Sequence, residues 1–149
     1  MPLVLWRISQ YPGLSGIGGL YGDGRWHTKG RPVVYTAEHP ALALVETMAH
    51  LDLSLDEVPD TLKLCRIEVD DRLGVHTRTL PAGWQANEVM SRKVGDAWLT
   101  ARERPLFAVP SAILPHSTNY LINPTHPDVA GRAAEVSVED IWIDRRFIR

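Results

Sequence analysis

The sequence predicts a single α+β domain, with a mixed or antiparallel sheet and flanking helices. Short apolar runs of the kind found in strands outnumber the segments with helical spacing. Strands and helices do not alternate regularly, which argues against a doubly wound α/β fold. A length of 149 residues suits one domain with one core, so residues 1–149 are treated as one unit.

Five segments have the short apolar pattern of strands, at residues 3–8, 31–36, 61–69, 106–113 and 133–143. Two segments have helical spacing. The first begins at Pro40, which suits a first helical turn, and runs to Leu51 with a broad apolar face. Asn87 is expected to cap the second, which runs to about Arg102. Residues 52–60 are expected to form a polar connection, and the last two strands are joined by a segment rich in Asn, Pro and His.

Residues 13–24 contain six glycines, so this stretch is expected to be a loop. It is either a hairpin connection or a cradle for a ligand. Gly16 and Gly18 begin a dinucleotide-binding fingerprint, but Tyr21 stands where the third glycine is needed, and a strand rather than a helix follows. A Rossmann site is therefore disfavoured, and no P-loop motif is present.

Composition excludes several other classes. The net charge of −2 provides no basic field for nucleic acid or an anionic membrane. One cysteine allows neither an internal disulfide nor a four-thiolate zinc site, and the six histidines lack metal-ligand spacing, so no metal is expected. There is no secretion leader and no run of 18 apolar residues, so we expect a cytoplasmic protein.

Glu46 is an unusual residue for its place in the first helix, because its neighbours one turn away are mostly small or apolar. A carboxylate there must be paired or open to a cleft. It is either a buried ion pair with an arginine or an anion held near developing positive charge. Arg7 and Arg25 offer the complementary charge, and an arginine beside a glycine-rich loop suits a diphosphate.

Aromatic residues close to these arginines offer a second kind of contact. Trp26 and Tyr35 either provide faces for a heterocycle or belong to the core. Ser111 is not inside a G-x-S-x-G nucleophile motif.

Taken together, these segments resemble the RES domain, the toxin of bacterial toxin–antitoxin pairs. The matching features stand in family order over about residues 3–143: Trp6-Arg7, Gly24-Arg25-Trp26, Pro32-Val33-Val34-Tyr35-Thr36, the helix with Glu46, Val109-Pro110-Ser111 and Asn119-Tyr120-Leu121-Ile122-Asn123-Pro124. His27 departs from the pattern, because many members have Asn after the tryptophan.

The resemblance implies a fold similar to the ADP-ribosyltransferase toxins, NAD as substrate and no further cofactor or metal. It implies an Xre-like antitoxin as the partner that covers the active site and makes any DNA contact. Four positions match the family's catalytic residues: Arg25, Tyr35, Glu46 and Ser111. On the same analogy NAD is bound by Arg7, Arg25, Trp26, Tyr35 and Asn123.

The expected chemistry is cleavage of the nicotinamide–ribose bond through an oxocarbenium-like state that Glu46 stabilises. One alternative is a mono-ADP-ribosyltransferase with a protein target. Arginine-directed transferases commonly have a second glutamate two residues before the catalytic one, and Leu44 stands there, which favours hydrolysis. Another alternative is a non-catalytic partner-binding module. The sequence leaves the ADP-ribose acceptor and the oligomeric state open, and a homodimer is compatible with it.

Overall fold

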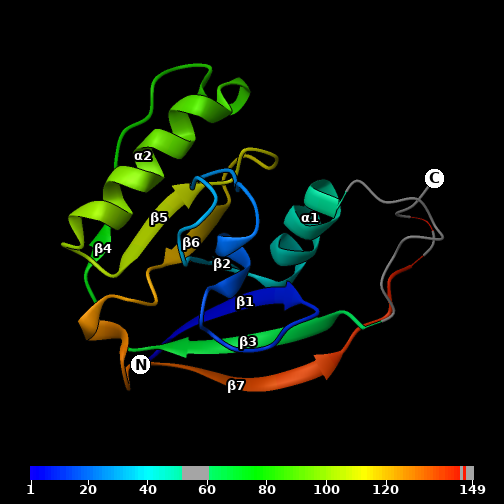
Figure 1. The fold of residues 1–149 in the computed structure, drawn as a ribbon. Coiled ribbons are helices and arrows are strands. Elements are labelled where there is room, and N and C mark those ends of the chain that lie inside the picture. Colours follow the sequence, from blue (N-terminus) through cyan, green and yellow to red (C-terminus); the bar gives the residue numbers. More distant parts are fainter. Residues whose placement is uncertain (52–60, 145, 147–149) are drawn as a thin grey trace.

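The computed structural model describes residues 1–51, 61–144 and 146. They form a seven-stranded sheet with the order β4-β5-β6-β2-β1-β3-β7 (Figure 1). Only the β4–β5 pair is parallel among the described strands. The strands are β1 (Leu3–Ser9), β2 (Val34–Ala37), β3 (Lys63–Val69), β4 (Val75–His76), β5 (Leu106–Pro110), β6 (Thr118–Ile122) and β7 (Ala133–Asp140). With helices α1 (Pro40–Leu51) and α2 (Glu88–Ala101), this confirms the α+β prediction.

Both helices pack on the same face of the sheet, over different strands (Figure 1). Helix α1 contacts Trp6 and Ile8 of β1 and Ala37 of β2. Helix α2 packs through Val94, Trp98 and Leu99 on a cluster from β5 and β6. Because successive side chains in a strand alternate between faces, Ala37 and Tyr35 share this face of β2. The surface between α1 and α2 therefore lies over β2 and β6.

The opposite face of the sheet holds a second core, made by residues that alternate with those under the helices. Its members include Leu5, Val34, Ile67, Leu106 and Ile122, all of them buried. The glycine-rich loop connects β1 to β2: its early residue Leu14 packs on this second core, whereas Trp26 packs in the cluster under α2. The loop thus begins on one face of the sheet and ends on the other.

The helix boundaries follow the sequence signals. Pro40 opens α1, where its missing N–H leaves no bond unmade. The Asn87 side chain accepts a hydrogen bond from the backbone N–H of Met90 and caps α2. Gly95 allows α2 to approach the loop, since a Cβ at this position would lie 1.7 Å from the carbonyl oxygen of Trp26.

The main correction to the expected fold is β6. The sequence predicts a connection at residues 118–122, but they form a strand between β5 and β2. Polar and proline-containing flanks conceal its short apolar end, Leu121 and Ile122, which are both buried. Strand β2 begins at Val34 rather than at residue 31, β5 ends at Pro110, and the two-residue β4 was not expected. The predicted connection at 52–60 lies outside the described residues.

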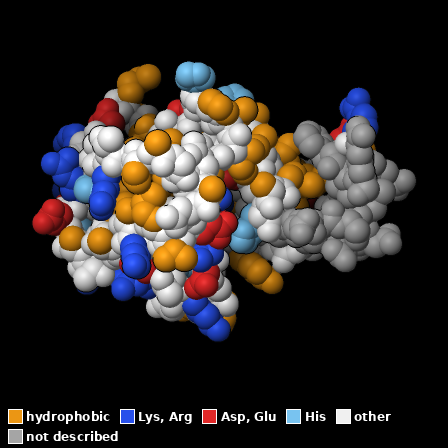
Figure 2. Space-filling model, turned by 90° about the horizontal axis from the view of Figure 1, so that it is seen from above, with side chains coloured by type: hydrophobic (Ala, Val, Ile, Leu, Met, Phe, Trp, Pro, Cys, Tyr) orange, Lys and Arg blue, Asp and Glu red, His pale blue; other side chains and the backbone are white. Residues whose placement is uncertain are grey.

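Seen from above, the surface shows Lys and Arg interspersed with Asp and Glu, with hydrophobic side chains between them (Figure 2). The described part of the chain contains no helix long and apolar enough to cross a membrane.

Candidate functional site

The centre of the candidate site is the carboxylate of Glu46, where three elements meet. Its Oε1 atom accepts a hydrogen bond of 2.6 Å from Ser111 Oγ, which lies just after β5. The same atom accepts a second bond of 2.8 Å from Asn119 Nδ2 of β6. A hydroxyl and an amide therefore hold the Glu46 carboxylate, and it forms no ion pair with an arginine among the described residues.

The Ser111 hydroxyl is fixed in orientation. Its oxygen accepts hydrogen bonds from the backbone N–H groups of Ile113 and Leu114, each 3.1 Å long. The hydroxyl has one proton, and Glu46 is the acceptor within reach, so Ser111 donates to the carboxylate. This geometry makes Ser111 a residue that orients Glu46, in agreement with the absence of a nucleophile motif around it.

Tyr35 lies on the same face, and its hydroxyl is fully engaged. The oxygen accepts the Trp26 backbone N–H at 3.1 Å and lies 2.6 Å from His27 Nδ1. His27 Nε2 lies 2.9 Å from the carbonyl oxygen of Gly22, which can only accept, so Nε2 holds the ring proton. Nδ1 is then the acceptor, and the Tyr35 hydroxyl donates to it. Burial raises the pKa of Tyr35 well above its usual range, so the side chain stays a neutral phenol.

The sheet register places Tyr35 close to the Glu46 cluster. Asn119 pairs with Ala37, and Leu121 pairs with Tyr35. Two residues along a strand correspond to about 7 Å, so Tyr35 lies one such step from the strand position that holds Glu46. Because its hydroxyl is already used, the part of Tyr35 left for a ligand is the ring.

Arg25 lies where the glycine-rich loop meets the start of α2. Its Nη1 atom donates to the Gln85 carbonyl at 2.8 Å, and its Nη2 lies 3.5 Å from a Glu88 carboxylate oxygen. The other oxygen of Glu88 binds Arg92 at 2.7 Å. Two guanidinium groups therefore share one carboxylate, and all three side chains are partly exposed. This corner has an excess of positive charge and suits an anionic ligand.

Arg7 does not join these residues. Along β1 it shares a face with Leu5, which packs in the second core, whereas Glu46 lies on the helix above Trp6 and Ile8. The Arg7 guanidinium donates to the carbonyl oxygen of Gly13 and holds the start of the glycine-rich loop. Burial lowers its pKa. Its contacts are those of a loop anchor, and its NAD-binding role stays a prediction.

Trp26 and Asn123, which are also predicted to bind NAD, are both buried and contact other parts of the protein. Trp26 is 3 % exposed and packs against Trp84 and Phe107, with ring centroids 5.4 and 5.8 Å apart. A ring this deeply buried packs in the core, which is the alternative that the sequence left open for Trp26, and its NAD-binding role stays a prediction. Asn123 is 2 % exposed, and its side-chain oxygen accepts from the N–H and hydroxyl of Thr125 in a tight turn. This turn explains the buried Asn123 without a ligand.

Asn119 is the contact residue that sequence reasoning missed. It belongs to the 119–124 motif, in which the resemblance assigns NAD binding to Asn123 alone. Had residues 118–122 been identified as a strand, alternation would have placed Asn119 and Leu121 on the helix-covered face. Arg92 and Glu88 were also missed, because nothing in the sequence links α2 to the loop around Arg25.

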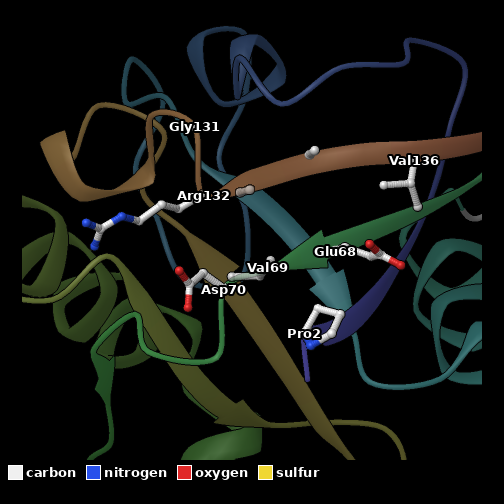
Figure 3. Close-up of a pocket in the computed structure, with 9 residues that line it drawn as sticks. Pro2, Glu68, Val69, Asp70, Gly131, Arg132 and Val136 are labelled. Atoms are coloured by element: carbon white, nitrogen blue, oxygen red, sulfur yellow. The ribbon is translucent and has the colours of Figure 1, made fainter.

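A hollow of about 290 Å³ lies elsewhere, where β3 ends and β7 begins (Figure 3). Its walls include Pro2 and Val69. Its two acidic residues are already paired, Glu68 with Arg66 and Asp70 with Arg72. It contains none of the predicted site residues.

In the described ranges no three His, Cys, Asp or Glu side chains gather closely enough to hold a metal ion.

Comparison with known proteins decides the family. The family model described as the RES domain matches residues 4–144. The chain belongs to the RES domain family. Relatives of this RES-family chain include a protein named Toxin Res from Pseudomonas putida, 45 % identical over 97 % of this chain and 99 % of the relative. Another, named Prs ADP-ribosylating toxin, from Sphingobium sp., is 36 % identical over 100 % of this chain and 99 % of that protein.

The fold is also that of a solved member of a toxin–antitoxin pair. A chain in the crystal structure of the M. tuberculosis MbcT–MbcA toxin–antitoxin complex superposes with a TM-score of 0.71. The alignment covers 95 % of this chain and 85 % of the other at 19 % identity, so the similarity concerns the fold.

Proposed function

We propose that this RES-family chain is the toxin of a toxin–antitoxin pair and that it degrades NAD by cleaving the nicotinamide–ribose bond. The observation that supports this most is the Glu46 carboxylate, which two donors hold on the helix-covered face. Tyr35 lies one step along the sheet, and its hydroxyl binds the backbone N–H of Trp26, the residue that follows Arg25. The family and the names of the relatives agree with a catalytic toxin.

Glu46 would act on the sugar. When the bond from ribose C1′ to the nicotinamide nitrogen breaks, its electron pair returns to that nitrogen and nicotinamide leaves as a neutral group. The ribose then has positive charge at C1′ and the ring oxygen, and a carboxylate held in place stabilises it. Water adds to C1′ and releases a proton. A neutral leaving group needs no strong general acid.

Arg25 and Tyr35 would hold the rest of the nucleotide. A diphosphate has two negative charges, and Arg25 can exchange the 3.5 Å contact with Glu88 for two parallel hydrogen bonds to phosphate. The Tyr35 ring offers a face to the nicotinamide, since its hydroxyl is engaged with Trp26 and His27.

The partner we propose is an Xre-like antitoxin that covers this site. The loop after β5 exposes two large apolar side chains, Ile113 at 46 % and Leu114 at 45 %. Both backbone N–H groups of this pair bind Ser111, so the apolar surface is adjacent to the Glu46 cluster. A partner segment that buries it also blocks access to the carboxylate.

The test is to identify the products formed by the purified chain, freed of antitoxin, from NAD. Mass spectrometry should detect nicotinamide and free ADP-ribose. Absence of both products after incubation of NAD with the folded protein would refute the proposal. Expression of the chain should also arrest growth, and expression of Glu46→Ala should not; a harmless wild type would favour the non-catalytic binding module.

Transfer of ADP-ribose to a protein is the second candidate, because a relative that matches along its whole length is named an ADP-ribosylating toxin. NAD labelled in its adenylate half separates the two reactions. Label on a protein band from a cell lysate indicates transfer, and label confined to small molecules indicates hydrolysis.

A further inference from the structure

Asn119 has an unusual pair of environments at its two amide atoms. A carboxylate can only accept, so the amide nitrogen must be the atom that faces Glu46, at 2.8 Å. The orientation of the side chain is therefore fixed, and Oδ1 points away from the carboxylate. Among the described residues Oδ1 is buried and has no hydrogen-bond partner.

The two oxygens of Glu46 are also in different environments. Both donors, Ser111 Oγ and Asn119 Nδ2, bind Oε1. No described residue donates a hydrogen bond to Oε2. Two donors from different elements, one after β5 and one within β6, fix the plane and the rotation of the carboxylate more firmly than either donor alone.

We propose that Asn119 is a positioning residue for the NAD-cleaving reaction: together with Ser111 it immobilises Oε1 of Glu46 and leaves Oε2 as the oxygen that faces the ribose. This inference rests on the proposed function, because it assigns the parts of the same carboxylate. Asn119 acts through Glu46 and does not itself react.

Sheet stability alone does not account for an asparagine at this place. Its neighbours across the strands are Ala37 of β2 and Val109 of β5, both buried and apolar. An unpaired buried acceptor destabilises a fold, and an apolar side chain of similar size would avoid that cost. An asparagine at this position is explained by its amide nitrogen, Nδ2, which is the second hydrogen-bond donor to Glu46.

The test uses two substitutions of Asn119, with kcat, KM and melting temperature measured for each. Asn119→Asp has nearly the same shape but places a second carboxyl group against Glu46. The two groups either repel each other or share one proton, so Glu46 loses its neutral donor or part of its charge. Asn119→Leu removes both polar atoms. We expect kcat for NAD cleavage to fall roughly 10- to 100-fold in both, with KM changed less than about threefold. The Leu variant should melt no lower than the wild type.

The matched control is Asn87→Asp at the start of α2, where both residues cap a helix, and it should retain wild-type kcat. If both Asn119 variants keep wild-type kcat while Glu46→Gln is inactive, the inference fails and the proposed function stands. If Glu46→Gln is itself active, the proposed function fails. If Asn119→Leu melts lower than the wild type, the kcat of Asn119→Asp distinguishes the two roles. A wild-type kcat in Asn119→Asp means that Asn119 is purely structural. A loss in kcat with little change in KM supports positioning.

Discussion

Replacing Gly95 by alanine tests how closely α2 must approach the loop that holds Arg25. The added Cβ would lie 1.7 Å from the Trp26 carbonyl oxygen and 2.7 Å from its carbonyl carbon. Cβ atoms essentially never come within 3.0 Å of another heavy atom, so the helix and the loop must separate by at least 3.0 − 1.7 = 1.3 Å. Both contacts are backbone atoms, which cannot turn aside as the end of a side chain can.

Two opposing effects determine whether Gly95→Ala is more or less stable than the wild type. Alanine is the better helix former, and that preference alone would stabilise α2 by about 1 kcal/mol. Overpacking a tight contact costs about 1–3 kcal/mol, and here the separation also disturbs Ser91, which bonds the Arg25 carbonyl at 2.5 Å. Loss of the Ser91 hydrogen bond costs about 1 kcal/mol, which offsets the gain in helix preference. The overpacking cost then remains, and we expect Gly95→Ala to melt roughly 2–12 °C lower.

Scanning calorimetry on the purified chain measures the effect, with Gly18→Ala as the matched control. A Cβ at Gly18 meets no atom within 4 Å, so this variant should melt within about 2 °C of the wild type. If Gly95→Ala is as stable as the wild type or more so, the close approach of α2 to Trp26 is not present in solution and the reasoning is refuted.

Three further outcomes are expected. Tyr35→Phe leaves the Trp26 N–H and His27 Nδ1 unpaired, so urea unfolding should show a loss of about 1–3 kcal/mol, and no loss would contradict the hydroxyl network. Arg25→Lys should raise KM for NAD roughly tenfold with a smaller change in kcat, because lysine cannot form two parallel bonds to a phosphate; an unchanged KM would remove Arg25 from the diphosphate site. Burial raises the pKa of Cys65 from its ordinary 9 to about 11, so the unfolded thiol ionises first and stability falls as pH rises between these values. Cys65→Ala should lose less stability over that window in urea titrations, and an equal slope would show that the thiol is not buried.

Local signals in the sequence were sufficient for the helices and most of the strands. Pro40 and the apolar spacing that follows it define α1 correctly, and the Asn87 side chain caps α2 as expected. These features act within one or two turns of chain, so a single sequence contains them. The strands flanking α1 were found for the same reason, with small errors at their ends.

The arrangement of the site depends on contacts between distant segments, and the sequence does not contain these. Alternation shows that Arg7 and Trp6 lie on opposite faces of β1, but it cannot show which of them α1 covers. The helix covers Trp6, so Glu46 and Arg7 are separated by the sheet. Likewise Asn119 becomes a partner of Glu46 only because β6 lies between β5 and β2.

The most direct test of the proposed reaction is the rate of nicotinamide release from NAD, measured for the purified wild type and Glu46→Gln in parallel. Gln has the same shape as Glu and lacks its charge, so it removes the electrostatic stabilisation of the sugar and little else. We predict release by the wild type and a loss of roughly 100-fold or more in the variant. Equal rates, or no release by folded wild type, would contradict the assignment of Glu46 as the catalytic carboxylate.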